Sequence, residues 1–226
     1  VTLSPGTGET FALASAITNT GGNTNNVLKT GYGTVTLTSS ANTYTGGTSV
    51  TAGTLLVNST TGSGAVSVSS GATLGGTGII IGATTIAAGG IHTAGTSVTA
   101  ATPVATLGKE TFTHSSGITY SQGSIFEWNL TANTETSIGT RGLDYDAVNT
   151  AALATSGTKA IFRVVLNGTQ DFSEEFWNTN RTWSDIFTHA AGGASHDIAA
   201  IFKNTVEYWN SGGVVTGVPN TQGSFT

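Results

Sequence analysis

The side chains best suited to chemistry lie in the second half of the chain. Asp144 and Asp146 stand two residues apart, so both carboxylates would share one face of a strand. A hard cation such as Ca²⁺ needs several oxygen ligands, and Glu127 with loop carbonyls would complete such a set. The competing interpretation, which we favour, is that the two acids cap a turn and keep its strand solvated.

Polysaccharide cleavage would need clustered acids together with an arginine or lysine base on one face. Residues 30–108 contain no Asp, Glu, Lys or Arg, so that stretch offers no catalytic groove. Asp144 and Asp146, with Arg141 and Arg163, are the remaining candidates. No serine stands in a Gly-x-Ser-x-Gly elbow. The sequence therefore predicts a protein that is not an enzyme, with no catalytic residues.

The four histidines show no metal-ligand spacing. His189 and His196 are separated by a glycine pair, and His92 and His114 stand alone in different segments. We expect all four in solvated loops, with no bound metal and no cofactor.

The four tryptophans are a second possible binding feature. Stacked indole rings can form a platform for sugars, but core and cap packing explains the same residues more simply. They are Trp128, Trp177, Trp183 and Trp209.

The composition excludes several classes of partner. Charged residues make up 8% of the 226-residue chain, against roughly a quarter in an average soluble domain. The seven bases are scattered, so we expect no nucleic-acid partner, and the longest apolar runs are too short for membrane insertion. Without cysteine there is no disulfide and no thiolate metal site. A chain without an initiator Met is expected to be a processed product or a fragment of a longer protein.

The first half of the chain is a succession of short strands and glycine corners. Residues 1–27 are predicted to form an N-terminal strand pair, 1–3 with 10–17, followed by a polar loop. From residue 28 to 109, short alternating strands such as 34–38, 54–57 and 65–69 are separated by glycine pairs, and the unit at 71–78 is echoed at 82–90. This pattern predicts an all-β, right-handed parallel β-helix, with an antiparallel sandwich as the alternative.

Several motifs in this region resemble the autotransporter-associated β-strand repeat. They are LKTGYG at 28–33, NTYTGGT at 42–48, GTL at 53–55 and GATLGGTG at 71–78. The likeness covers about residues 28–95, with departures at Ser40 and at 91–95. It implies a β-helical unit of a bacterial surface or secreted protein, without catalytic function.

Residues 110–170 are predicted to form wider β-coils with an aromatic core, because the strands are longer and the apolar side chains larger. Residues 171–226 are predicted to be a C-terminal cap and tail, with short helices at 173–177 and 181–187. The tail around 218–220 resembles the segment upstream of the sorting signal in PEP-CTERM surface proteins. The signal itself is not in the sequence.

Together these features predict a non-enzymatic, extracellular structural or adhesive β-helix protein. An N-terminal strand at residues 1–20, or the ends of the helix, would pair with a second copy and build a head-to-tail surface fibre. The competing interpretation is that this strand folds back as a cap. The alternative function is a carbohydrate-binding surface module whose partners are glycans.

Overall fold

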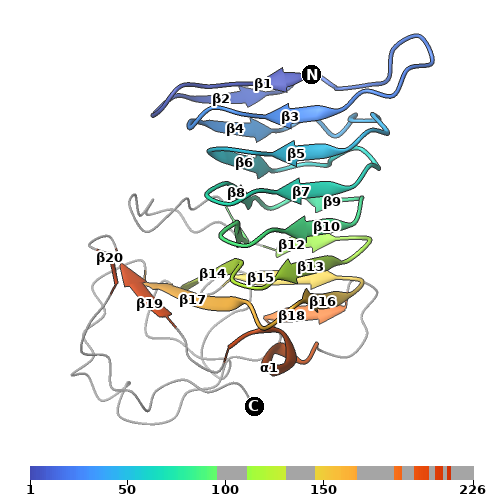
Figure 1. The fold of residues 1–226 in the computed structure, drawn as a ribbon. Helices are drawn as coiled ribbons and strands as arrows, with labels where there is room; N and C mark the ends of the chain where they lie inside the picture. The colour runs from blue at the N-terminus through green and yellow to red at the C-terminus, as the bar shows by residue number, and fades with distance from the viewer. Residues whose placement is uncertain are drawn as a thin grey trace.

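The computed structural model describes residues 1–95, 111–130, 146–166, 186–189, 196–203, 207–210 and 213–214. The chain winds into a stack of coils, with the N-terminus at one end and the short helix α1 (Ile198–Ile201) near the other (Figure 1). Among the described strands, every pair is parallel except β19 with β20. The fold is therefore the predicted parallel β-helix, and the antiparallel sandwich is excluded.

The first sheet runs along the whole stack in the order β1-β3-β5-β7-β10-β13-β16. Its strands are short because each coil turns a corner after two to four residues. They are β1 (Thr2–Leu3), β3 (Val27–Lys29), β5 (Thr48–Val50), β7 (Val66–Val68), β10 (Thr84–Ile86), β13 (Ile118–Ser121) and β16 (Leu153–Ser156).

The second sheet contains nine strands in the order β2-β4-β6-β8-β11-β14-β17-β19-β20. Its last strand is antiparallel, so this wall ends differently from the first. The strands are β2 (Thr10–Leu13), β4 (Thr34–Leu37), β6 (Thr54–Val57), β8 (Thr73–Gly75), β11 (Ile91–Thr93), β14 (Ile125–Leu130), β17 (Ile161–Leu166), β19 (Glu207–Asn210) and β20 (Gly213–Val214).

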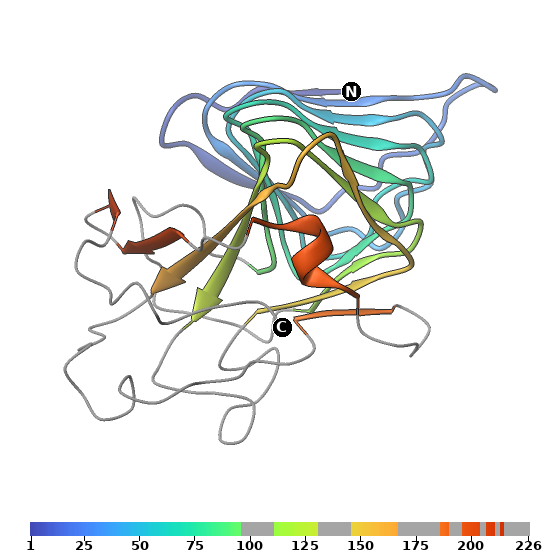
Figure 2. The same cartoon turned by 60° about the horizontal axis from the view of Figure 1, so that its bottom comes forward.

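A third sheet joins partway down the stack, in the order β18-β15-β12-β9. Its strands are β9 (Ile79–Ile80), β12 (Thr111–His114), β15 (Ala147–Thr150) and β18 (Phe187–His189). From β9 onward the interior of the helix, which we call the lumen, is bounded by three walls (Figure 2).

The core forms because successive residues of a strand point to opposite faces. In β7, Val66 and Val68 are buried whereas Ser67 between them is exposed. The strand register keeps the same positions facing inward in every coil, so Val50, Val68 and Ile86 stack on one another in the lumen. Each coil thus buries its aliphatic side chains against those of its neighbours.

The coils nearest the C-terminal end of the stack, from β12 to β18, which we call the lower coils, have an aromatic core in the described residues. Phe126, Phe162 and Phe187 are buried, one from each of three strands. Phe202, which ends α1, places its ring 5.5 Å from that of Phe162 and 5.7 Å from that of Phe187. Helix α1 and Phe202 therefore plug the C-terminal end of the lumen (Figure 2).

Two predicted elements differ from the structure. Strands β1 and β2 do not pair with each other; each is the first strand of a separate sheet and pairs with the next coil. Of the helix predicted at 181–187, only Ile186 and Phe187 are described, and Phe187 begins strand β18. The described helix lies at 198–201 instead, where the Asp197 side chain accepts a hydrogen bond from the Ala200 N–H at 3.1 Å. The helix predicted at 173–177 falls outside the described residues.

Candidate functional site

A chain of hydrogen bonds crosses the lumen below the point where the third sheet begins. Thr84 Oγ1 lies 2.9 Å from His114 Nδ1, and His114 Nε2 lies 3.0 Å from His92 Nε2. His92 Nδ1 in turn lies 2.5 Å from the Tyr120 hydroxyl oxygen. Thr84 and Tyr120 belong to the first sheet, His92 to the second and His114 to the third. These four residues, which we call the lumen chain, therefore join all three walls.

The position of each member follows from strand alternation. His114 shares its face of β12 with the buried Phe112, two residues before it. His92 is paired in register with Leu74 above and Phe126 below, both buried in the lumen. The prediction that these two histidines are solvated is therefore wrong, because both lie on strands and neither is exposed.

Burial sets the charge state of the lumen chain. Burial lowers the pKa of His114 to about 3. The pKa of His92 is well below its ordinary value, first because of burial and second because of repulsion from His114. Burial also raises the pKa of Tyr120 well above its ordinary value. All three rings are therefore neutral near neutral pH.

Neutral rings impose an order on the hydrogen atoms. Each neutral imidazole carries one N–H, so one of the two facing Nε2 atoms donates and the other accepts. If Tyr120 donates to His92, then His92 donates to His114 and His114 to Thr84; otherwise every bond reverses. Since all four side chains are buried, the arrangement binds the walls together and presents no reactive atom to a solute.

A buried lysine holds two successive corners of the repeat region. The Lys29 side chain points into the coil, is fully buried and donates from Nζ to the carbonyl oxygens of Thr30 and Gly31 at 2.8 Å and of Ala52 at 2.9 Å. Burial lowers the pKa of this ammonium. Gly53 leaves room for it: a Cβ there would lie 2.8 Å from Nζ, and its φ of +62° also favours glycine.

An ion-pair ladder lies on the second sheet, on the face of β14 opposite the buried Phe126. The register aligns Glu127, Arg163 and Glu207 on three adjacent strands. Arg163 contacts Glu127 at 2.8 Å and Glu207 at 3.3 Å. Burial raises the pKa of Glu127, and the hydrogen bond and charge of Arg163 oppose that rise. Glu127 is therefore engaged in an ion pair rather than in a cation site.

The proposed carboxylate pair is only half described. Asp144 and Arg141 fall outside the described residues. Asp146 is buried, so the expectation that it solvates its strand is wrong; its carboxylate accepts from the Asn129 backbone N–H at 2.9 Å and from Asn129 Nδ2 at 2.5 Å. Among the described residues, no group of three or more His, Cys, Asp or Glu side chains is placed to hold a metal ion.

The remaining candidates divide between core and undescribed segments. His189 and His196 are half-buried, with ring centroids 6.0 Å apart. Trp128 is buried and donates from Nε1 to the Asp146 carbonyl oxygen at 3.0 Å, so the core interpretation of this tryptophan is confirmed. Trp177, Trp183 and the side chain of Trp209 fall outside what the structure describes.

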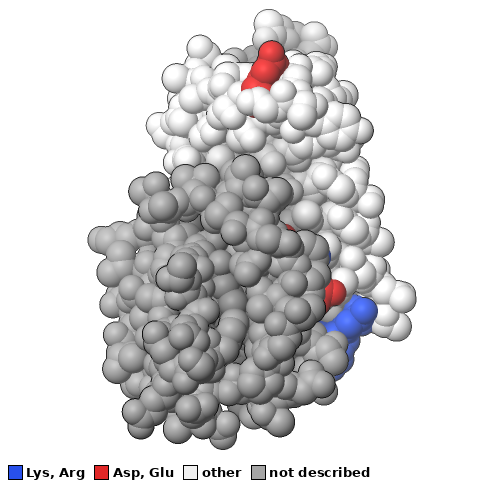
Figure 3. Space-filling view, turned by 90° about the vertical axis from the view of Figure 1, so that its left-hand side faces the viewer, with Lys and Arg blue, Asp and Glu red and all other residues white. Residues whose placement is uncertain are grey.

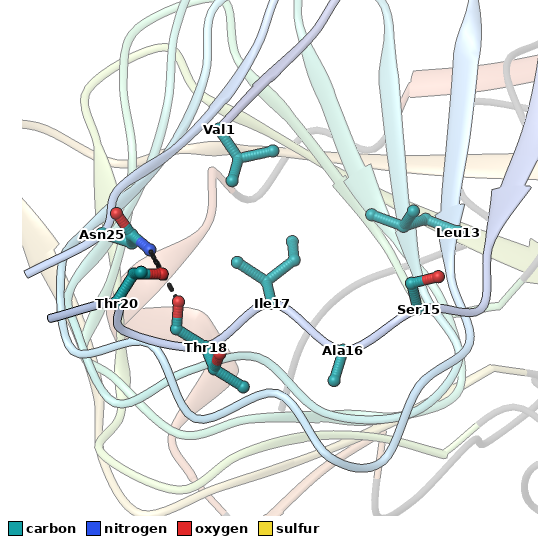
Figure 4. Close-up of a pocket in the computed structure, with 8 residues that line it drawn as sticks. All are labelled: Val1, Leu13, Ser15, Ala16, Ile17, Thr18, Thr20 and Asn25. Carbon is teal, nitrogen blue, oxygen red and sulfur yellow. Dashed lines mark hydrogen bonds between the residues drawn. The ribbon is translucent and has the colours of Figure 1, made fainter.

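The N-terminal end of the stack contains an apolar hollow of about 320 Å³. Val1, Leu13 and Ile17 point into it, and polar atoms of Thr20 and Asn25 lie at its rim (Figure 4). Phe11, on the adjoining strand β2, has 39% of its surface exposed although its register partner Val35 is fully buried. The apolar lumen is thus covered at the C-terminal end and uncovered at this end of the described chain.

Sequence reasoning missed the lumen chain and the Lys29 corner, although a signal existed for each. The alternation in IHT at 91–93, TFTH at 111–114 and ITY at 118–120 places one polar ring of each segment among inward-facing residues. Lys29 likewise alternates with Leu28 in β3 and follows the inward-facing Val27 by two positions.

Comparison with known families agrees with this picture for one segment. Residues 27–57 match the model of the passenger-associated-transport-repeat. No match to the chain was found among curated proteins. Within the described segments, no helix has the length and apolar character needed to cross a membrane. The matched unit is a structural repeat of autotransporter passenger domains, so residues 27–57, with the Lys29 corner inside them, are similar to a repeat of the kind found in extracellular or surface passengers.

Proposed function

We propose that this protein is a non-enzymatic structural rod of the bacterial surface, of the PEP-CTERM type, that assembles head to tail into a fibre. The observation that carries the proposal is the first sheet, which runs through the whole stack and has β1 and β16 as its edge strands within the described residues. Edge strands present unpaired N–H and C=O groups that pair readily with another chain.

The N-terminal end suits such a contact because it combines a strand edge with apolar surface. Strands β1 and β2 each lack a partner on the outer side among the described residues. Val1, which lines the hollow beside them, has 53% of its surface accessible, and Phe11 on β2 is also exposed. A second copy that paired with this edge would cover both side chains.

At the opposite end of the described chain, the first sheet ends in β16 and the third sheet in β18, but of these two walls only the first also has a strand, β1, at the N-terminal end. In the first sheet, β16 follows the same parallel direction as β1, so pairing β1 of one copy with β16 of the next would continue the sheet. The second sheet ends in the antiparallel strand β20, and Phe202 fills the lumen. The proposed contact therefore uses the first sheet, with α1 beside it.

The surface chemistry suits an extended structure that needs solubility without many ions. On the face in Figure 3, the described surface of the repeat coils is almost free of Lys, Arg, Asp and Glu apart from one acidic patch near the N-terminal end. Outward positions of successive coils carry hydroxyls instead, as in the aligned residues Ser49, Ser67 and Thr85.

Negative-stain imaging and sedimentation of the protein over a range of concentrations test the fibre. Phe11→Lys places a charge on the uncovered end and should abolish filaments, whereas Ser67→Lys places the same charge on a side wall and should leave them intact. Monodisperse single particles of the unaltered protein at every concentration would refute head-to-tail assembly. Closed dimers would indicate that two N-terminal ends meet instead.

One exposed aromatic residue supports the alternative of glycan binding. Tyr32 has 77% of its surface exposed at the corner between β3 and β4. An exposed phenol ring can stack on a sugar. Binding on a glycan array that is lost in Tyr32→Ala, and kept in Tyr44→Phe, would favour this function over fibre formation.

A further inference from the structure

Ionisable groups are divided unequally between the two halves of the stack. All four histidines occur at position 92 or later, and of the twelve acidic residues only Glu9 precedes them. The coils from β1 to β8 therefore contain almost nothing that changes charge between neutral and mildly acidic pH. Acid acts on the lower part of the molecule, where the lumen chain lies.

We propose that the lumen chain is an acid-sensitive switch that opens the three-walled coils from β10 to β18 while the repeat coils from β1 to β8 stay folded. The proposal is independent of head-to-tail assembly, because it concerns contacts within one copy. It rests on the geometry of four buried side chains from three walls.

A proton added to His92 or His114 has no counterion in the lumen among the residues that the structure describes. The His92 ring lies 5.6 Å from the ring of Phe112 and 5.5 Å from that of Phe126, measured between centroids. Among the described residues, the one titratable side chain that contacts the pair from another element is Tyr120. Its phenol is neutral and cannot balance a buried imidazolium.

The other described titratable groups near His92 and His114 do not supply a counterion either. On the C-terminal side, Thr150 is the register partner of His114, and His189 on the next strand is the register partner of Thr150. His196 Nε2 lies 3.1 Å from the carbonyl oxygen of Thr150. Neither imidazole can supply a negative charge. Glu127, on the opposite face of β14 from Phe126, is held by Arg163.

Protonation also breaks the order of hydrogen bonds. A doubly protonated His92 would donate to both neighbours. In the order in which Tyr120 donates, its hydroxyl would then lose its acceptor inside the core, and in the reverse order two N–H groups would face each other between His92 and His114. An unsatisfied buried hydroxyl next to a buried charge favours the open state, in which both are hydrated. Because the chain joins all three walls, opening at this point separates them.

The sign of the effect follows from the depressed pKa of both histidines. In the unfolded chain a histidine takes up its proton near its ordinary pKa, and in the folded lumen it does so only at much lower pH. Between those two values the open state binds more protons, so stability falls as the pH falls. The repeat coils have no such term: the Lys29 ammonium stays charged in acid, and its carbonyl acceptors do not titrate.

Acid titration followed by two probes tests the switch. All four tryptophans occur at position 128 or later and Trp128 is buried in β14, so a change in tryptophan emission does not arise within residues 27–75. Pulsed hydrogen exchange at one common pH, after incubation in neutral or acidic buffer, reports on residues 27–75 separately. We expect tryptophan emission to change in mild acid while exchange protection of 27–75 is retained. Simultaneous loss of both signals would overturn the proposal.

A variant with an apolar lumen identifies the trigger. Replacing all four members together, as Thr84→Val, His92→Leu, His114→Leu and Tyr120→Phe, leaves no orphaned polar group and should move the acid midpoint of tryptophan emission down by at least about one pH unit. The matched control, His189→Asn with His196→Asn, should leave the midpoint in place. An unchanged midpoint in the four-residue variant, or a shift of the control alone, would refute the assignment.

Should that variant fail to fold, the unaltered protein still decides the matter. Imidazole resonances in NMR spectra should show two histidines that do not titrate in the folded protein and that vanish at the pH where tryptophan emission changes. Four histidines that titrate reversibly with intact emission would contradict the proposal.

Discussion

His92 and His114 face each other through their Nε2 atoms at 3.0 Å, although they stand 22 positions apart and belong to different walls. Two neutral imidazoles can meet in this way only if one donates and the other accepts. The direction chosen at this contact fixes the donor and acceptor at Thr84 and Tyr120 as well. The lumen chain is therefore a single unit, and removing any member leaves a partner unsatisfied.

Removing the hydroxyl at the end of this unit should destabilise the fold. Tyr120→Phe leaves His92 Nδ1 without its partner in a site closed to water, and such losses cost about 1–3 kcal/mol. Urea unfolding followed by tryptophan fluorescence measures the change. Tyr32→Phe removes the same atom from an exposed ring and should be neutral. Equal effects of the two changes would contradict the role of the buried bond.

Stability should rise with pH across the window set by His114. The folded pKa of His114 is about 3 against an ordinary value of 6.5. Between these values the unfolded chain binds the extra proton, so stability is fully present above the upper value and is lost as the pH falls toward the lower one. The limiting change is on the order of 5 kcal/mol. Urea midpoints compared at about pH 7 and about pH 5 should differ less in His114→Leu than in the unaltered protein; identical differences would contradict this origin.

Removing the charge at the repeat corner should be costly. Lys29→Met keeps the aliphatic bulk but leaves three carbonyl oxygens, on Thr30, Gly31 and Ala52, without their donor. We expect a loss of about 2–5 kcal/mol of unfolding free energy. Lys203→Met, at an exposed position, should change it by less than about 0.5 kcal/mol. A Lys29→Met protein as stable as that control would show that the three hydrogen bonds of Lys29 are dispensable for stability.

The ion-pair ladder should respond more strongly to the loss of Arg163 than to the loss of the Glu207 charge. Arg163→Met leaves the buried Glu127 carboxylate unpaired, which typically costs about 3–5 kcal/mol. Glu207→Gln removes a partner whose side chain is 41% exposed and should cost less than about 1 kcal/mol. Combining Arg163→Met with Glu127→Gln should restore part of the loss. Chemical denaturation of the unaltered protein and the three variants measures these differences. A double variant no more stable than Arg163→Met would argue against coupling between Arg163 and Glu127.

Much of the repeat region could be predicted from local pattern. The strand predicted at 54–57 is β6, and those at 34–38 and 65–69 each exceed β4 and β7 by one or two residues. This worked because a period of two and a glycine corner are properties of neighbouring residues. The parallel pairing followed from the echo of one coil in the next.

The buried polar contacts could not be predicted in the same way. Alternation shows that His92 faces inward, but not that its ring reaches His114, since that depends on how many residues each coil takes to close. Coil length changes at this level: 18 positions separate the paired residues Val66 and Thr84, whereas 34 separate Thr84 and Ile118. Helix α1 escaped detection because four residues carry too little periodic signal, although Asp197 marks its start.

The direction of the hydrogen bonds between coils has a mechanical consequence. These bonds run along the axis of the stack. Tension applied at the N-terminus would therefore break the bonds of one coil at a time, rather than the bonds of many coils at once. Each repeat coil of 18 residues, such as that from Ser49 to Ser67, would release about 60 Å of extended chain as it peels. Unfolding from the N-terminus would reach the lumen chain at the level of Thr84, where side-chain hydrogen bonds join three sheets. Under tension the repeat coils would therefore unfold and extend first, and the aromatic coils would stay folded and resist further extension.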